Sequence, residues 1–300
     1  MINGKTKVFG LFGNPIEHTI SPYIHQLLYN ETGYNGTYNP FFVPTGMLEE
    51  AVKGMKGMNI KGVNVTVPYK VSVMDYLDEV DDMAANIGAV NTIVPEYNED
   101  KNKYRLKGYN TDWIGLSMQC DYDGIPIKNR DIVIVGAGGS ERSVAFMCIR
   151  NKAKSITLMN RTLEKAEILR DHVKQVAEKD SSNSSVVAIE ATELIDSSYI
   201  KEGSIVFQTT SAGMYPNVDL IPIESESFFN KVDFIVDIIY NPKETAFMRL
   251  GKSYGAKVAN GLGMLFFQAV KAFELWTEIK LEKDQLERVL GELEQFIYDK

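Results

Sequence analysis

A fully apolar run at residues 132–135 leads directly into the glycine-rich turn Gly136-Ala137-Gly138-Gly139 and then into a helical pattern at residues 143–150. A strand without polar alternation is buried on both faces, which is typical of a parallel sheet covered by helices on each side. Glycines between such a strand and a helix let the backbone and the helix N-terminus approach a pyrophosphate closely. The segment therefore predicts a doubly wound α/β unit with a dinucleotide site.

Further short apolar runs recur along the chain, with helical patterns between them. One set predicts a first α/β unit with parallel pairing, and its strands are expected at 8–12, 38–43, 62–67 and 89–94. A second set continues the unit of the glycine turn, with strands expected at 155–159, 186–189, 205–207 and 234–239. Ser21 before Pro22, and Thr45 ahead of residues 47–55, are predicted to cap helices through their hydroxyls.

The composition favours a globular protein with a small-molecule partner. Three hundred residues with 44% hydrophobic content suffice for two compact domains. A net charge of −8 argues against a nucleic-acid-binding or basic membrane-surface protein. Cys120 and Cys148 lack a metal-ligand spacing, so a disulfide framework or structural zinc is not expected. Since the chain contains no apolar targeting run and no stretch of roughly 18 apolar residues, we expect a cytoplasmic protein without a membrane span.

Four polar motifs lie next to short apolar runs in the first part of the chain. Each supplies hydroxyl, amide, ammonium or carboxylate groups where a buried strand is expected to end. This composition is the one expected for a site that holds a polyhydroxylated ligand. The motifs are Gly13-Asn14-Pro15-Ile16-Glu17-His18-Thr19-Ile20-Ser21-Pro22, Asn64-Val65-Thr66-Val67-Pro68-Tyr69-Lys70, Gly88-Ala89-Val90-Asn91-Thr92 and Gly108-Tyr109-Asn110-Thr111-Asp112.

These motifs are followed by the glycine turn, by Asn160-Arg161-Thr162, and by Asn260-Gly261-Leu262-Gly263-Met264 with Gln268. In this order and spacing they resemble the shikimate dehydrogenases over nearly the whole chain. The resemblance implies an α/β fold of two domains with a cleft between them. An α/β substrate-binding domain is expected over residues 1–110 and a Rossmann-like NADP-binding domain over 111–259. Residues 260–300 are expected to form helices that return to the substrate-binding domain.

The cofactor half of the sequence favours NADP. Glu141 replaces the third glycine of the usual fingerprint, a departure that the family tolerates. About 20 residues beyond the turn, where an NAD enzyme carries an acid for the ribose 2′-hydroxyl, residues 155–163 contain none. Arg161 stands there instead, and its guanidinium suits a 2′-phosphate, although an arginine after a strand can also be merely solvated. The predicted cofactor-binding residues are Gly136, Ala137, Gly138, Gly139, Asn160, Arg161, Thr162 and Gly261.

Lys70 and Asp112 each close a motif in which apolar and hydrogen-bonding residues converge. The resemblance implies that they form the catalytic pair, and proton transfer with a substrate hydroxyl needs a group held by a hydrogen-bonding neighbour. The alternatives are a surface charge for Lys70 and a helix cap for Asp112, ahead of the helical pattern at 113–118. No metal is implied, because hydride transfer to a carbonyl can proceed with a hydrogen-bonding acid alone.

The resemblance also implies a substrate site of hydroxyl, amide and phenol groups. Thr19 and Ser21 match the two hydroxyl residues that bind the substrate carboxylate, with threonine in place of the usual serine at position 19. Ser21 has an alternative role as a helix cap, and Tyr240 has one as a core residue before Asn241-Pro242. The predicted substrate-binding residues are Thr19, Ser21, Thr66, Asn91, Tyr240 and Gln268.

The expected activity is the reversible NADP-dependent reduction of 3-dehydroshikimate to shikimate, in aromatic amino-acid biosynthesis, by a monomer or homodimer. One alternative is a quinate/shikimate dehydrogenase that uses NAD or both cofactors. Arg161 speaks against it and Thr19 speaks for it. The other alternative is a catalytically silent sensor that binds NADP or shikimate, and the presence of both Lys70 and Asp112 speaks against it.

Overall fold

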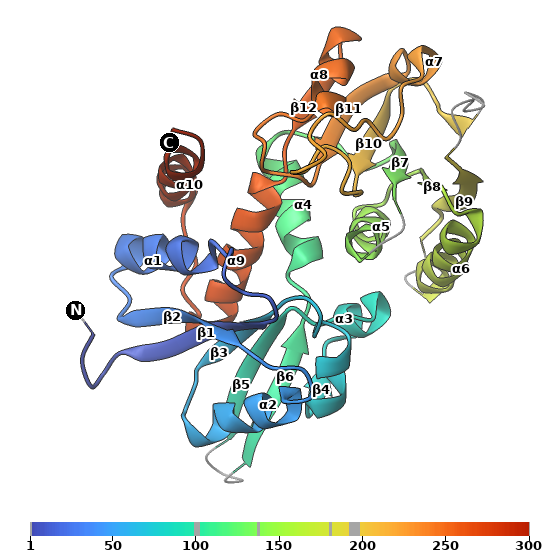
Figure 1. The fold of residues 1–300 in the computed structure, drawn as a ribbon. Helices are drawn as coiled ribbons and strands as arrows, with labels where there is room; N and C mark the ends of the chain where they lie inside the picture. The colour runs from blue at the N-terminus through green and yellow to red at the C-terminus, as the bar shows by residue number, and fades with distance from the viewer. Residues whose placement is uncertain (1, 99–102, 137–138, 180–181, 192–198, 300) are drawn as a thin grey trace. The chain divides into compact units, whose positions relative to one another are not determined.

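The computed structural model describes residues 2–98, 103–136, 139–179, 182–191 and 199–299. The chain forms two compact units, one from Met1–Gly115 with Phe266–Lys300 and the other from Leu116–Leu265. It leaves the first unit within helix α4 (Asp112–Tyr122) and returns within helix α9 (Leu262–Thr277), both labelled in Figure 1. The domain limits expected after residues 110 and 259 stay a prediction.

The first unit is built on a mixed six-stranded sheet with the order β2-β1-β3-β5-β6-β4. β1 pairs in parallel with β2 and β3, and β4 pairs in parallel with β6. β5 runs antiparallel to both of its neighbours, β3 and β6. The strands are β1 (Lys7–Gly13), β2 (Gly36–Phe42), β3 (Gly62–Val65), β4 (Glu79–Val80), β5 (Thr92–Asn98) and β6 (Lys103–Tyr109).

The parallel pairing predicted for the first unit is therefore wrong at β5. A parallel neighbour needs a crossover connection of about a dozen residues or more, whereas β5 and β6 follow each other as an antiparallel hairpin that starts at the pair Thr92 and Tyr109. The predicted strands include no counterpart of β6. In that strand Leu106 is buried and Arg105 is exposed, because one face of the hairpin is covered and the other meets solvent.

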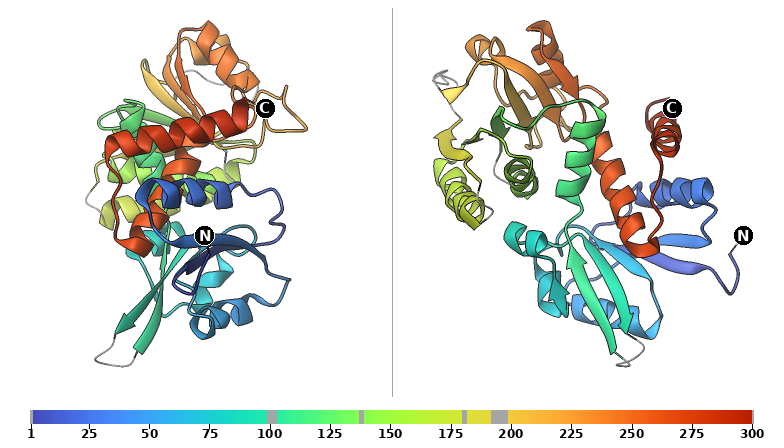
Figure 2. Two further views of the ribbon diagram at one scale, coloured as in Figure 1. Left: turned by 90° about the vertical axis from the view of Figure 1, so that its left-hand side faces the viewer. Right: turned by 180° about the vertical axis from the view of Figure 1, so that it is seen from behind.

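Helices cover both faces of this sheet (Figures 1 and 2). On one face, Phe9 of β1 stacks on Trp276 of α9 at 5.1 Å and lies 6.0 Å from the Tyr29 ring of α1. On the other face, Phe12 of β1 belongs to a buried cluster with Met55 of α2. Apart from α4 and α9, the helices of this unit are α1 (Ser21–Thr32), α2 (Leu48–Gly57), the 3-10 helix η1 (Ser72–Tyr76), α3 (Asp82–Ile87) and α10 (Lys283–Tyr298).

Both helix caps predicted in this unit are wrong. α1 begins at Ser21, with Ile20 at the N-cap position and no side-chain cap. The backbone N–H of Ser21 donates instead to the Thr19 hydroxyl at 3.2 Å. α2 begins at Leu48 behind an uncapped Met47, so the Thr45 hydroxyl does not cap it. The Ser21 hydroxyl therefore does not serve as the N-cap of α1.

The second unit contains an all-parallel sheet with the order β12-β11-β10-β7-β8-β9. Helices α5 and α6 lie on one face and α7 and α8 on the other (Figure 1), which confirms the predicted α/β class with a Rossmann-like sheet. The strands are β7 (Asp131–Val135), β8 (Ser155–Asn160), β9 (Ser185–Glu190), β10 (Ser204–Gln208), β11 (Val232–Asp237) and β12 (Lys257–Ala259). The helices are α5 (Ser140–Arg150), α6 (Leu163–Lys179), α7 (Glu226–Phe229) and α8 (Ala246–Ser253).

The direction in which the second sheet grows reverses between β7 and β10, since β8 and β9 extend it one way and β11 and β12 the other. Ligands of doubly wound sheets bind beyond the carboxyl ends of the strands at this reversal. Gly136 follows β7 there, and Thr209 follows β10 and donates from its backbone N–H to the Val135 carbonyl at 2.9 Å. None of the helices in the part of the chain described is both long and apolar enough to span a membrane.

Candidate active site

Lys70 and Asp112 meet in the first unit. Nζ of Lys70 donates to Oδ2 of Asp112 at 2.8 Å, and the two side chains are 33% and 16% exposed. Lys70 follows β3 by a short turn, and its carbonyl accepts a hydrogen bond from the N–H of Val90 at 2.7 Å. Asp112 is the first residue of α4, and its N–H donates to Oδ1 of Asn110 at 3.1 Å. The pair is thus held from three of the four polar motifs.

Asn91 supports the same carboxylate. Its Nδ2 donates to Oδ1 of Asp112 at 2.8 Å and to the Thr111 hydroxyl at 3.0 Å. Its Oδ1 accepts from the backbone N–H of Thr111 at 2.7 Å. Asn91 is 2% exposed. Both ends of its amide are therefore bonded to protein groups, and the amide has one orientation only.

Three more polar residues, which the predicted site does not include, extend this network. Asn64 lies in the fully buried strand β3 and accepts from the Tyr38 hydroxyl at 2.8 Å. Its Nδ2 donates to the Thr92 hydroxyl at 2.9 Å. An asparagine within an otherwise apolar buried strand is the sequence signal that could have indicated such a network, because a buried amide requires partners.

The other predicted substrate residues of the first unit lie near strand ends and the start of α1. The Thr19 hydroxyl donates to the Ser21 hydroxyl at 3.1 Å, and both residues are partly exposed. Thr66 directly follows β3, and its N–H donates to the Phe12 carbonyl at 2.9 Å. Gln268 on α9 lies 3.5 Å from the Thr111 hydroxyl through its Oε1. Tyr240 belongs to the second unit, beyond the end of β11.

The glycine turn of the second unit has the features of a phosphate site. Gly136 has a φ of 122°, which favours glycine, and a Cβ there would lie 2.4 Å from the Thr209 hydroxyl. A Cβ on Gly139 would meet no atom within 4 Å. Gly139 is the N-cap of α5 and provides no side-chain cap, and a helix N-terminus after a glycine turn favours an anion. The predicted contacts of Ala137 and Gly138 lie outside the described residues.

The residues proposed to distinguish the 2′-phosphate lie at the end of β8, which neighbours β7. Nδ2 of Asn160 donates to the Thr162 carbonyl at 2.9 Å and closes a tight turn. Arg161, at the tip of this turn, is exposed, and no ion pair is formed by it within the described ranges. These groups and the start of α5, which no side chain caps, fit a phosphorylated dinucleotide.

A buried carboxylate organises the loops after β10 and β11. Oδ2 of Asp237 accepts from the Thr245 hydroxyl at 2.7 Å, and Oδ1 accepts from the Ile239 N–H at 3.0 Å. Burial raises the pKa of Asp237 to about 6, although these hydrogen bonds act to lower it.

Gly261 packs closely against the loop after β11. The Ile239 carbonyl accepts a hydrogen bond from the Gly261 N–H, and a Cβ at position 261 would lie 1.9 Å from the carbonyl oxygen of Ile238. Position 261 thus requires glycine for close backbone packing.

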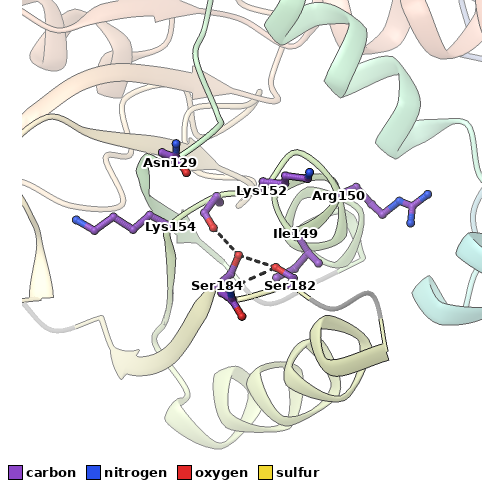
Figure 3. Close-up of a pocket in the computed structure, with 9 residues that line it drawn as sticks. Asn129, Ile149, Arg150, Lys152, Lys154, Ser182 and Ser184 are labelled. Atoms are coloured by element: carbon purple, nitrogen blue, oxygen red, sulfur yellow. Dashed lines mark hydrogen bonds between the residues drawn. The ribbon is translucent and has the colours of Figure 1, made fainter.

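A separate pocket of 510 Å³ opens near the end of α5 and the start of β8 in the second unit (Figure 3). None of the predicted site residues lines it. The Ser182 and Ser184 hydroxyls lie 3.0 Å apart there, and Lys154 pairs with Asp131 at 3.1 Å. Since β8 starts here, the pocket lies at the strand end opposite to Asn160. We do not assign it to the candidate site.

Three family models match the chain in sequence order. The shikimate dehydrogenase substrate binding domain matches residues 11–93, the shikimate/quinate 5-dehydrogenase model matches 122–239, and the shikimate 5′-dehydrogenase C-terminal domain matches 261–290. The chain belongs to the shikimate dehydrogenase family. The resemblance predicted from the seven motifs is confirmed.

Individual relatives support this membership over the whole chain. Shikimate dehydrogenase (NADP(+)) from Caldanaerobacter subterraneus subsp. tengcongensis is 41% identical over 293 residues, which cover 97% of this chain and 99% of the relative. A shikimate dehydrogenase solved in complex with NADP+ is 36% identical with a TM-score of 0.83, and the match covers 98% of this chain and 97% of that one. The enzyme from Thermus thermophilus, in complex with NADP(H) and shikimate, is 29% identical with a TM-score of 0.78, over 95% and 99% of the two chains. The predicted class, an NADP-dependent oxidoreductase, is confirmed.

Proposed function

We propose that this protein catalyses the reversible NADP-dependent reduction of 3-dehydroshikimate to shikimate, with Lys70 and Asp112 as the proton-transfer pair. Membership of the shikimate dehydrogenase family supports the substrate class and the cofactor. The 2.8 Å contact between Nζ of Lys70 and Oδ2 of Asp112 is the observation that carries the assignment of the pair. It joins an acid and an orienting carboxylate from two separate motifs.

NADPH, when bound, would supply the hydride for the carbonyl carbon of the substrate. As negative charge develops on the carbonyl oxygen, the Lys70 ammonium donates the proton that converts this oxygen to a hydroxyl. Asp112 stabilises and aims the ammonium before the transfer. Because the Lys70 side chain is 33% exposed, water can return a proton to the neutral amine. In the oxidation of shikimate, the neutral amine takes the hydroxyl proton, and NADP+ would be the acceptor of the hydride.

The start of α1 supports binding of the substrate carboxylate by Thr19 and Ser21. Their hydroxyls lie 3.1 Å apart, and the Ser21 hydroxyl does not cap the helix, whereas the Thr19 hydroxyl accepts the Ser21 N–H at 3.2 Å. An anion at this position is also stabilised by the helix dipole. We propose that the partly exposed Thr66 and Gln268 contact the ring hydroxyls and that Tyr240 lies near the carboxylate. The contact predicted for Asn91 stays a prediction, because both hydrogens of its amide are already donated to Thr111 and Asp112.

For the cofactor, we propose that the start of α5 and the glycines of its turn bind the pyrophosphate. Asn160, Arg161 and Thr162 bind the 2′-phosphate, and Gly261 lets the backbone approach the cofactor. The uncapped Gly139 and the exposed Arg161 support these roles. The cytoplasmic location, the monomeric or homodimeric state and the pathway stay predictions for this chain.

The variant Lys70→Ala tests the pair. We expect kcat to fall on the order of 10²-fold or more, the scale for removal of a general acid, while NADP affinity stays unchanged. Lys53→Ala is the matched control, because Lys53 also pairs with a carboxylate of this unit, Glu49, but at the exposed surface. Steady-state rates with shikimate and quinate, each with NADP and NAD, also separate the two enzyme alternatives and the silent sensor. A near-normal kcat in Lys70→Ala, with only a raised KM, would mean that Lys70 binds substrate without transferring the proton.

A further inference from the structure

A continuous chain of hydrogen bonds leads from the Tyr38 hydroxyl on β2 to the Asp112 carboxylate. Tyr38 donates to Oδ1 of Asn64 at 2.8 Å, and Nδ2 of Asn64 donates to the Thr92 hydroxyl at 2.9 Å. The Thr92 hydroxyl donates to Oδ1 of Asn91 at 3.0 Å. Nδ2 of Asn91 then donates to Oδ1 of Asp112 at 2.8 Å. We call Tyr38, Asn64, Thr92 and Asn91 the buried relay, since all four are buried.

The donors of the relay all point in one direction. Nδ2 of Asn64 uses both of its hydrogens, because it also donates to the Asn91 carbonyl at 3.1 Å. The single hydrogen of Thr92 is then left for Oδ1 of Asn91, which at 3.0 Å is nearer than the Thr111 hydroxyl at 3.2 Å. Oδ1 of Asn91 also accepts a hydrogen bond from the backbone N–H of Thr111. Each bond therefore polarises the next one toward Asp112, which strengthens the chain.

The surroundings of the relay keep it in one protonation state. Burial raises the pKa of Tyr38 well above its ordinary value, so the hydroxyl remains a donor at any pH of an assay. The His25 ring stacks on the Tyr38 ring at 4.1 Å and 8°, which restricts the direction of the phenol. Burial lowers the pKa of His25 to about 3, so this neighbour stays neutral.

We propose that Tyr38 and Thr92 are positioning residues for the reaction, which act through Asn64 and Asn91 on Asp112. By occupying Oδ1 of Asp112, the relay leaves Oδ2 to the Lys70 ammonium at 2.8 Å. The inference rests on the proposed role of the Lys70 and Asp112 pair. Tyr38 and Thr92 are 7% and 0% exposed, so their contribution is to fix where the carboxylate and the ammonium point.

The first test is Thr92→Val, which preserves shape and removes the hydroxyl. We expect kcat to fall between about 5-fold and 10²-fold, since a misplacement of catalytic groups by about 1 Å can cost 10²-fold. The KM for NADP should not change. Thr92→Ser restores the hydroxyl and should recover most of the lost kcat. If Thr92→Val lowers the thermal midpoint but keeps kcat, the hydroxyl serves stability only and the proposal is wrong.

The second test compares two buried tyrosines of one aromatic cluster. Tyr38→Phe removes the first donor of the relay, and kcat should fall severalfold or more. Tyr29→Phe is the matched control, because Tyr29 is 3% exposed, lies 6.2 Å from the His25 ring, and has a buried hydroxyl without a hydrogen-bond partner in the described part of the chain. Its kcat should not change. Equal effects of the two substitutions on kcat would overturn the role of the Tyr38 hydroxyl.

A double variant separates this inference from the proposed function. Because the relay affects the reaction by way of Asp112 and the Lys70 ammonium that Asp112 orients, Thr92→Val should have no further effect on the residual kcat of Lys70→Ala, a non-additivity expected of coupled residues. Multiplication of the two losses would show that Thr92 acts independently of the pair and would refute positioning. An active Lys70→Ala would refute the proposed function itself, whatever Thr92→Val does. An inactive Lys70→Ala beside a normal Thr92→Val would refute the relay alone.

Discussion

We expect a single change, Arg161→Ala, to reduce the preference for NADP over NAD. Arg161 is exposed and forms no ion pair in the described ranges, so its removal should alter the free energy of unfolding by only about 0.5 kcal/mol or less. A charge-assisted hydrogen bond to the 2′-phosphate contributes about 1.5 to 3 kcal/mol, which corresponds to roughly 10- to 150-fold in affinity. NAD lacks this phosphate. The ratio of the two affinities should therefore fall by nearly the whole loss for NADP.

The assay is a comparison of Kd and KM for NADP and NAD, at saturating shikimate and at two ionic strengths. The NADP affinity of the native protein should weaken with salt more than that of the variant, because salt screens an exposed charge pair. Arg170→Ala is the control on the neighbouring helix α6, since the Arg170 guanidinium already pairs with Asp171 at 2.8 Å and Glu167 at 3.4 Å. It should change neither cofactor affinity. An equal loss for NADP and NAD in Arg161→Ala would refute the reasoning.

Two further predictions concern the substrate carboxylate and the buried acid of the second unit. Thr19→Val should raise the shikimate KM by roughly 10- to 150-fold, through loss of a hydrogen bond to a charged group, while Thr19→Ser keeps activity; an unchanged KM in a folded valine variant would exclude the hydroxyl from carboxylate binding. The raised pKa of Asp237, about 6 in the folded protein against 3.8 as the ordinary value, means that folding favours its protonated form. Its stabilising contribution is fully present below about pH 4 and is lost as pH rises through about 6, on the order of 3 kcal/mol in all. Chemical denaturation gives the free energy of unfolding of the native protein and of Asp237→Asn at each pH. As pH rises from about 4 to about 7, the native protein should lose stability relative to the variant. A difference between the two that does not change with pH would contradict the raised pKa of Asp237.

The sequence predicts best where one local pattern has one physical solution. The run at 132–135 is apolar at every position and is followed by glycines, and in the structure it lies in β7, one of the two central strands of a parallel sheet. The same holds for the family motifs, whose order and spacing indicate the fold without any knowledge of contacts. The contact between Lys70 and Asp112 is expected only from the family resemblance, because a sequence separation of 42 positions does not determine how far apart two residues lie in space.

Sequence patterns failed where the answer depended on a neighbour that the local pattern does not specify. The start of α1 is an example, since a serine before proline is a good cap by local chemistry, yet Thr19 accepts the N–H of Ser21 and the helix begins one residue earlier than such a cap would allow. The direction of β5 is another. Its apolar residues fit a parallel or an antiparallel strand equally well, and the hairpin with β6 decides between them.

The error at β5 also explains why the buried relay was missed. In the antiparallel pairing of β3 and β5, Asn64 lies directly opposite Thr92, and residues opposite each other in this way have side chains on the same face about 5 Å apart. A shift of the register by one residue would turn Thr92 to the other face of the sheet and separate the two groups. Asn64 and Thr92 are tolerable in the core because both find hydrogen-bond partners there, each other included. The antiparallel direction of β5, which no local pattern specifies, therefore allows the hydrogen bonds that link the interior of the sheet to the carboxylate of Asp112.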